Sequence, residues 1–307
     1  FGPLLENPRM MLLGAAGQTG AEPKIGFLKR HAFPLTFALL IAAHLALTFY
    51  FEKPKIILSD TPIAWLDYDT HIGQAYVVSE ALDRFGKSWA YDPGTLAGYL
   101  NGVGFDTDNK AWELWTFALW KLGLSKGLAF NLFILLAHLM VPWVVFFSAR
   151  LFGLGRWTAL LAAVMGIALW CFDAYPRWCW WVGMTAWAMA SYFALLPLAL
   201  FYRYLKTLKW SYIALLAVFL SAAHLIHPLT FVILVVPMAF LYLRAFNKLK
   251  ALQHAGIVAA ALSVLAVNAY WLIPIFKYLH YAAPPVTGFY GQSSAAFFIT
   301  DYLGLLN

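Results

Sequence analysis

Long apolar runs alternate with short polar stretches along most of this chain. Seven runs are long enough, or nearly so, to cross a membrane, since about 20 apolar residues span a hydrocarbon core of about 30 Å. They lie at residues 32–51, 128–147, 157–172, 183–202, 210–226, 229–246 and 255–276. The pattern predicts an all-α polytopic membrane protein with about seven transmembrane helices.

The polar segment at residues 52–127 is much longer than the others and has helical patterning of its own. Residues 69–86 place apolar side chains on one stripe and predict an amphipathic helix that ends at Gly86. Residues 110–122 predict a second helix, whose dense aromatic side chains favour the membrane interface. The residues between these two helices predict a loop.

Basic residues lie in every second connecting segment. By the positive-inside rule these segments are cytoplasmic, together with a tail at residues 1–31. Residues 52–127, 173–182 and 277–307 are then outside, around a membrane module at 32–276. The chain starts with Phe and stops just beyond an apolar stretch, so we expect it to continue into a longer protein. The basic residues are Lys24, Lys29, Arg30, Arg150, Arg156, Arg203, Lys206, Lys209, Arg244, Lys248 and Lys250.

Composition agrees with this topology and adds a candidate site. The chain is 63% hydrophobic and 11% charged, and its net charge of +7 lies in the short turns between spans, which argues against a nucleic-acid partner. Of its 14 acidic residues, 9 lie between residues 52 and 108. Acids gathered in one external segment predict a reaction site at the outer membrane face. The 9 acids are Glu52, Asp60, Asp67, Asp69, Glu80, Asp83, Asp92, Asp106 and Asp108.

The strongest candidates are Asp67, Asp69 and His71, just before and within the first external helix. A carboxylate there can act as a general base or ligate a metal, and an imidazole can assist it. The alternative for an Asp is to cap the helix, which suits Asp69 better because it directly precedes the predicted helix. The alternative for His71 is a hydrogen bond to nearby backbone.

A second acidic motif, Asp106-Thr107-Asp108-Asn109, has the Asp-x-Asp spacing that holds a divalent cation such as Mg²⁺ or Mn²⁺ in some glycosyltransferases. Asp108 and Asn109 also directly precede the second predicted helix. Capping of that helix is therefore the competing interpretation.

Three polar residues nearer the membrane could bind a ligand. Arg177 could hold a lipid phosphate or reach to the headgroups as an anchor. His224 and His227 would share a helix face and point toward a phosphate or a metal. Within the spans, we interpret His44 and His138 as hydrogen-bond partners between helices.

Cys171 and Cys179 fall at the outer end of the hairpin between the third and fourth predicted spans. An oxidising compartment would permit a disulfide between them. Two free buried thiols are the alternative, and the spacing alone does not decide between these states.

The order of these motifs resembles the GT-C superfamily of membrane glycosyltransferases. One span is followed by an acidic motif with His, an amphipathic helix, then Trp89-x-Tyr91-Asp92-Pro93 and Ala97-Gly98-Tyr99. The nearest branch is similar to the bacterial pyruvoyl-tetrahydropterin-synthase-related membrane proteins, in which an Asp stands four residues before a His, here Asp67 and His71. His224–Pro228 and Asn268–Pro274 resemble short motifs in later spans of that group.

The resemblance implies a membrane glycosyltransferase in a bacterial inner membrane. It would move a sugar from a polyprenyl-phosphate donor to a glycan, lipid or protein acceptor at the outer face. Asp67 would be the first catalytic candidate and Asp69 the second, with Trp89, Tyr91 and Tyr99 among the substrate-binding side chains.

Two other functions compete with glycosyl transfer. They are a transporter or flippase of lipid-linked or envelope substrates, and a non-catalytic envelope assembly factor. Transporters place ionisable residues within spans near the bilayer midplane. This chain keeps nearly all its charge in the connecting segments, which favours chemistry at the surface.

Overall fold

The computed structural model describes residues 24–94, 98–103 and 109–278. The chain divides into two units, residues 1–39 and 40–307, and the boundary falls inside α1. The helices of the first half are α1 (Lys24–Phe51), α2 (Pro54–Ile57), α3 (Asp67–Phe85), α4 (Lys110–Lys121), α5 (Lys126–Leu151) and α6 (Arg156–Phe172). The remaining helices are α7 (Ala174–Val182), α8 (Thr185–Phe193), α9 (Leu195–Thr207), α10 (Trp210–Ile226), α11 (Thr230–Ala245), η1 (Phe246–Lys248) and α12 (Ala251–Tyr278).

The expected fold class, a mainly α-helical chain with several membrane-length helices, is confirmed, but the expected number of spans is not. Among the described residues, 5 helices are long and apolar enough to cross a membrane, or up to 6 if α6 and α7 form one span bent by 57°. The number seven is not reached, because α10 has only 17 residues and the α6–α7 pair is broken at Asp173. The five are His31–Phe51, Lys126–Leu151, Thr185–Thr207, Thr230–Lys248 and Ala251–Tyr278.

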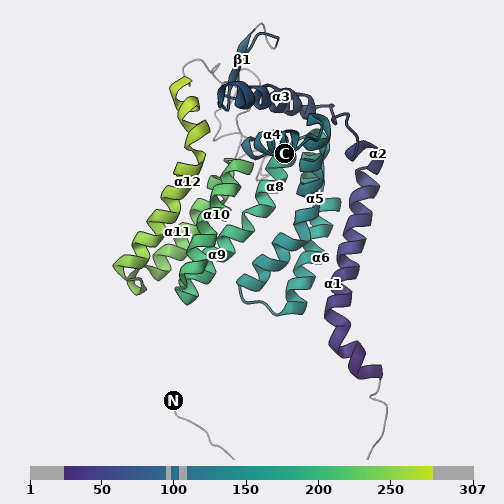
Figure 1. Ribbon diagram of the computed structural model, residues 1–307. Helices are drawn as coiled ribbons and strands as arrows, with labels where there is room; N and C mark the ends of the chain where they lie inside the picture. Colours follow the sequence, from purple (N-terminus) through teal and green to yellow (C-terminus); the bar gives the residue numbers. More distant parts are fainter. Residues whose placement is uncertain (1–23, 95–97, 104–108, 279–307) are drawn as a thin grey trace, which may run out of the picture. The chain divides into compact units, whose positions relative to one another are not determined.

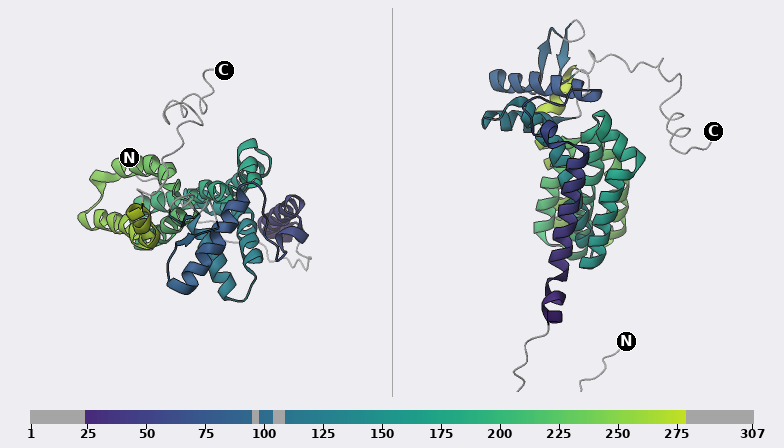
Figure 2. Two further views of the ribbon diagram at one scale, coloured as in Figure 1. Left: turned by 90° about the horizontal axis from the view of Figure 1, so that it is seen from above. Right: turned by 90° about the vertical axis from the view of Figure 1, so that its right-hand side faces the viewer.

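Within residues 40–307, α3 and α4 run across the ends of the long helices (Figures 1 and 2). Helix α5 packs against α6, α9, α4 and α8, and α10 packs against α12, α9 and also α4. Helices α3 and α4 thus both pack against the membrane-length helix α5.

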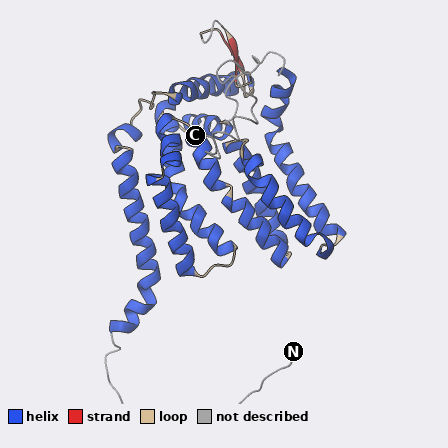
Figure 3. Ribbon diagram, turned by 180° about the vertical axis from the view of Figure 1, so that it is seen from behind, coloured by secondary structure: helices blue, strands red, loops and turns tan. Residues whose placement is uncertain are grey.

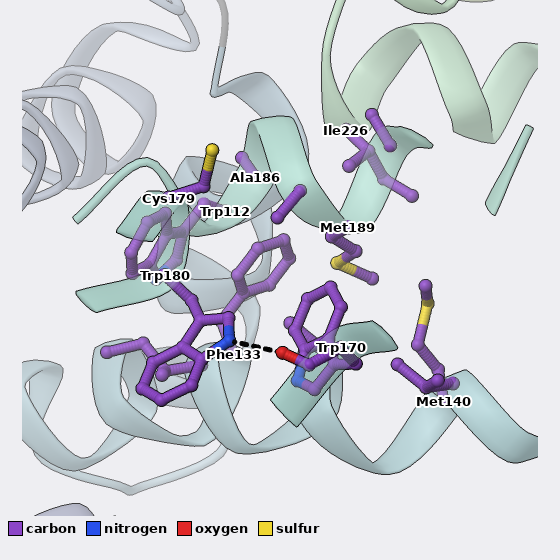
Figure 4. Close-up of a cluster of buried hydrophobic side chains, with 14 of the residues drawn as sticks. Trp112, Phe133, Met140, Trp170, Cys179, Trp180, Ala186, Met189 and Ile226 are labelled. Atoms are coloured by element: carbon purple, nitrogen blue, oxygen red, sulfur yellow. Dashed lines mark hydrogen bonds between the residues drawn. The ribbon is translucent and has the colours of Figure 1, made fainter. Parts of the chain in front are cut away.

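Aromatic side chains from α4, α5, α6 and α7 build the core at this junction. Trp112 is stacked between Phe130 and Phe133, with ring centroids 4.3 Å and 5.1 Å away. Both Trp170 and Trp180 are buried beside them (Figure 4). Trp112 of α4 is 1% exposed and packs on α5, so this part of the aromatic run of α4 belongs to the core.

The two predicted external helices are found close to their expected limits. Helix α3 starts two residues earlier than residue 69 and ends at Gly86, whose left-handed φ of 62° closes the helix. Helix α4 spans Lys110–Lys121, against the prediction of 110–122.

Two predicted loops are wrong. The residues between α3 and α4 form an antiparallel hairpin of β1 (Ala90–Asp92) and β2 (Tyr99–Asn101), the only strands among the described residues (Figure 3). The expected loop at 173–182 is helix α7. Its N-cap, Asp173, accepts a hydrogen bond from the backbone N–H of Tyr175 at 3.0 Å, which starts a new helix instead of a loop.

Candidate functional site

The first turn of α3 holds both leading acids. Asp67 and Asp69 lie in the first turn, and both are exposed. The interpretation of Asp69 as the helix cap is wrong: Leu66 occupies the N-cap position, and no side chain caps this end. Leu66 has a φ of 52°, which is uncommon for a branched residue and places strain directly before the acids.

Tyr68 anchors this turn from between the two acids. Its side chain is 2% exposed, and its hydroxyl lies 2.5 Å from the Trp180 carbonyl oxygen and 2.9 Å from Thr185 Oγ1. Burial raises the pKa of the Tyr68 phenol, so it stays protonated and donates to the carbonyl. The two carboxylates therefore project from a helix start that is fixed to the α7–α8 joint.

Gly183, in that joint, lets the two backbones approach closely. It has a φ of +114°, and a Cβ at this position would lie 2.6 Å from Tyr68 N and 2.9 Å from the carbonyl carbon of Asp67. Trp65 and Trp181 meet edge to face beside it, with ring centroids 4.9 Å apart. No side chain larger than hydrogen fits between α3 and the joint without moving one of them.

Replacing Gly183 with alanine is therefore expected to lower the thermal unfolding midpoint of the purified protein and displace the start of α3. Gly123→Ala is the matched control, because Gly123 has a φ of +101° with open space around it. Both variants carry backbone strain of roughly 1–3 kcal/mol, but only Gly183→Ala adds the overlap. Equal midpoints in the two variants would contradict the close approach.

The far half of α3 is fixed by ion pairs. Lys126 at the start of α5 contacts Glu80, and this hydrogen bond holds the pKa of Glu80 below its usual value. Lys121 of α4 lies 2.6 Å from Asp83. Both ends of α3 are thus attached to neighbouring helices, which fixes the direction in which the first turn presents its acids.

His71 connects α3 to α4. Its Nδ1 lies 3.0 Å from the Asn109 side-chain amide nitrogen, and its ring contacts Trp112 at a centroid distance of 5.6 Å. An amide nitrogen only donates, so Nδ1 accepts and the ring proton is on Nε2. His71 is buried, and its contact with Asn109 is to a side chain.

Asp106 and Asp108, the second acidic motif, lie outside the described residues. Asn109 occupies the N-cap position of α4 without a capping side-chain bond. Among the residues that the structure describes, no group of three or more His, Cys, Asp or Glu side chains could hold a metal ion.

The aromatic residues of the family-like motif belong to the hairpin or flank it. The ring centroids of Trp89 and Tyr278 are 5.0 Å apart. The ammonium of Lys87 lies over the Trp89 ring. Tyr91 is exposed, and its ring lies over Gly98, where a Cβ would meet the phenol oxygen at 1.9 Å. Tyr99 pairs with Asp92 in the ladder.

Arg177 lies on α7, so it comes from a helix rather than the expected loop. Its side chain is exposed, and the guanidinium carbon is 5.2 Å from the centre of the Phe51 ring. The aromatic contact expected around Arg177 is present, but the side chain is at the surface and not in an enclosed anion site.

The prediction that His224 and His227 share a helix face is wrong. Helix α10 ends at Ile226, and His227 is extended with a φ of −163° because the following proline disfavours a helical residue before it. His224 Nδ1 contacts the Leu220 carbonyl oxygen at 2.9 Å. His227 is buried, and its Nδ1 accepts from the backbone N–H of Leu229.

His224 lines an apolar cavity of about 770 Å³ between α10, α11 and α12. Asn268 and Trp271 also line it, and the Trp271 indole donates to the Asn268 side-chain oxygen at 2.8 Å. Polar residues of the later family-like motifs thus meet at one largely apolar cavity.

Several buried contacts were missed by the sequence analysis. Lys110 and Glu113 form an ion pair with side chains 1% and 3% exposed, and Lys110 also donates to the Gly102 carbonyl. The spacing of three residues between Lys110 and Glu113 on a predicted helix could have indicated this ion pair. The predicted roles of His44 and His138 between helices are confirmed, since His44 Nε2 lies 2.8 Å from the His138 carbonyl oxygen.

Cys171 and Cys179 are free, buried thiols, which is the second of the two states considered from the sequence. Cys179 packs beside Trp180 in the aromatic core (Figure 4).

Comparison with protein-family models, curated proteins and solved structures found no match to this chain.

Proposed function

We propose that this chain is the membrane part of a glycosyltransferase that moves a sugar from a polyprenyl-phosphate donor to an acceptor at the outer membrane face. The observation that carries the proposal is the first turn of α3. Two exposed carboxylates flank a fully anchored tyrosine, at the end of a bundle of apolar helices. A catalytic acid needs this combination of access and fixed position.

The cavity between α10, α11 and α12 gives separate support. It has the apolar lining and the volume, about 770 Å³, that suit an isoprenoid chain, and His224 and Asn268 add polar atoms. Arg177, exposed on α7, is a further cation suited to a phosphate. In this proposal the lipid-linked donor is recognised by the membrane helices, and the reaction occurs at α3.

One carboxylate of α3 would accept the proton of the acceptor hydroxyl as that oxygen attacks the anomeric carbon. The bond from the anomeric carbon to the phosphate oxygen breaks, and the phosphate leaves with its electron pair. A divalent cation, where one participates, would be held through carboxylate oxygens.

The direct test uses the purified chain in proteoliposomes with polyprenyl phosphate carrying a radiolabelled hexose or pentose, and a membrane extract as the source of acceptors. We expect sugar-dependent release of free polyprenyl phosphate, which the Asp67→Asn/Asp69→Asn double variant abolishes. Release that is undiminished in the double variant, or absent with every carrier sugar, would exclude this function for the chain.

A further inference from the structure

A second cavity lies at the end of the helix bundle away from α3. Its volume is about 530 Å³, and side chains of α5, α8, α9 and α10 line it. Within residues 40–307, α5 and α9 both end at this side of the bundle, and α10 begins there (Figure 1). The cavity shares no lining residue with the one between α10, α11 and α12, so it is a separate space.

Two arginines and a tyrosine line the cavity close to these helix ends. Arg150 lies in the last turn of α5, Arg203 in the last two turns of α9, and Tyr212 in the first turn of α10. Because the three helix ends lie on the same side of the bundle, the cavity has one strongly basic end.

The same three helices make the rest of the cavity apolar. Trp143 of α5, Leu196 of α9 and Phe219 of α10 line it, and each lies seven residues from the arginine or tyrosine of its own helix. Residues seven apart share a helix face and are separated by about 10 Å along the helix axis. The apolar walls therefore continue for about two helical turns beyond the basic end.

The arginines at the basic end have no acidic partner. In the part of the chain that the structure describes, the half-buried side chain of Arg203 makes no hydrogen bond or ion pair. Arg150 uses one N–H for the Leu154 carbonyl oxygen, at 2.6 Å, and a guanidinium has five donors. Residues 114–300 contain a single acid, Asp173, which caps α7. The helices that line the cavity thus contain two guanidinium charges and no carboxylate.

We propose that this cavity binds an anionic glycerophospholipid of the surrounding bilayer. Its phosphate lies at the end lined by Arg150 and Arg203, and an acyl chain lies along the apolar walls. Arginine binds phosphate oxygens through strong charge-assisted hydrogen bonds, and basic pockets between membrane helices bind anionic headgroups. The site contains none of the residues assigned to glycosyl transfer and does not depend on that proposal.

Two simpler explanations of the arginines account for less of the structure. A cation that only anchors a helix end among lipid headgroups needs no cavity, and Arg244 at the end of α11 has this simpler arrangement, since it is exposed and does not line the cavity. A free phosphate ion would contact the basic end alone and leave two turns of apolar wall without an occupant. A phospholipid matches both the charge and the apolar walls.

A bound lipid would also connect the helices around it. Helices α5 and α10 both pack against α9, and the cavity lies where all three contribute side chains. A ligand that binds only the folded protein stabilises it in proportion to its free concentration and affinity. We therefore expect the lipid to raise the thermal unfolding midpoint of the protein.

Native mass spectrometry of the full chain, freed of lipid in detergent and titrated with phosphatidylglycerol, tests the proposal. We expect one tightly retained phosphatidylglycerol, weaker retention of phosphatidylcholine with the same acyl chains, and no displacement by inorganic phosphate. Arg203→Gln should weaken phosphatidylglycerol binding by roughly 10–100-fold, the loss expected for a hydrogen bond between charged groups. Arg244→Gln is the matched control, with the same loss of charge at the same side of the bundle, and should bind as the wild type does.

A second pair of variants tests the cavity without changing the charge. Leu215→Trp adds volume at a residue that lines the cavity, so it should weaken retention of phosphatidylglycerol and remove its effect on the unfolding midpoint. Val218→Trp is the control, because Val218 is exposed on the same helix and does not line the cavity. It should bind the lipid as the wild type does.

Three results would overturn the lipid site. They are equal affinities of Arg203→Gln and Arg244→Gln for phosphatidylglycerol, equally tight binding of phosphatidylcholine, and displacement of the lipid by inorganic phosphate. If Arg203→Gln does not accumulate, Arg150→Gln provides the same decision against Arg244→Gln, since Arg150 is exposed and lines the same end. No sugar transfer enters these measurements, so their failure leaves the proposed glycosyl transfer untouched.

Discussion

Asp67→Asn is expected to lower glycosyl transfer by about 10²–10⁴-fold, the usual loss when a general base is removed. Asparagine keeps the shape of the side chain and removes its charge and basicity. Asp67 is exposed and makes no contact that holds α3 in place, since Tyr68 does that. The amount of protein in the membrane should therefore be unchanged. Release of polyprenyl phosphate, normalised to that amount, measures the effect.

Two further variants of α3 distinguish the loss of a catalytic acid from a displacement of the helix. Asp83→Asn removes an acid that pairs with Lys121 at the other end of the helix, and we expect wild-type activity. Asp69→Asn removes a helix-dipole contribution of about 0.3–1 kcal/mol and leaves the anchoring of the turn intact. Wild-type activity of Asp67→Asn at equal abundance would exclude Asp67 as the base, leaving Asp69 or the Asp106/Asp108 motif.

Lys110→Met is expected to destabilise the protein by about 3–5 kcal/mol, the largest stability loss predicted for any single substitution here. The reason is that Glu113, 3% exposed in the native protein, would keep a buried charge without its ammonium partner. The hairpin would also lose the bond from Lys110 to the Gly102 carbonyl. Thermal or denaturant unfolding of the purified protein, followed by circular dichroism, measures this loss.

The matched control is Lys121→Met, because its partner Asp83 is solvent-exposed and such a pair contributes about 0–1 kcal/mol. The double variant Lys110→Met/Glu113→Leu should recover most of the loss, since it removes both charges and replaces them with apolar volume. A Lys110→Met protein as stable as Lys121→Met would mean that the Glu113 charge is compensated by other groups.

Periodicity and capping signals were sufficient to predict most helices. The amphipathic stripe and Gly86 defined α3 to within two residues, and the aromatic run defined α4. The end of α6 at Phe172 agrees with the predicted span, but helix α7 was missed, because its start depends on the capping bond from the Tyr175 N–H to Asp173, which was not considered. The hairpin was missed because its strands have three residues each, too few for an alternating pattern.

The site was predictable only where local chemistry determines it. Exposed acids after a span could be inferred from composition, whereas the anchor Tyr68 could not, since its partners lie 112 and 117 residues away in the chain. Pro228 contained the information that His227 leaves the helix, and a closer application of the proline rule would have found it. His44 Nε2 meets the His138 carbonyl oxygen only because α1 and α5 face each other, which no local pattern encodes.

The 17 residues of α10 have a consequence for the surrounding bilayer. At 1.5 Å per residue the helix is about 25 Å long, roughly 5 Å shorter than the hydrocarbon core. A short span exposed to lipid normally thins the bilayer around it. Here α10 is flanked by α9 and α12 and packs against α4. In the proposed topology these neighbours would shield part of a short span, while Leu215 and Val218 of α10 stay exposed, so we expect the bilayer to thin on that side only.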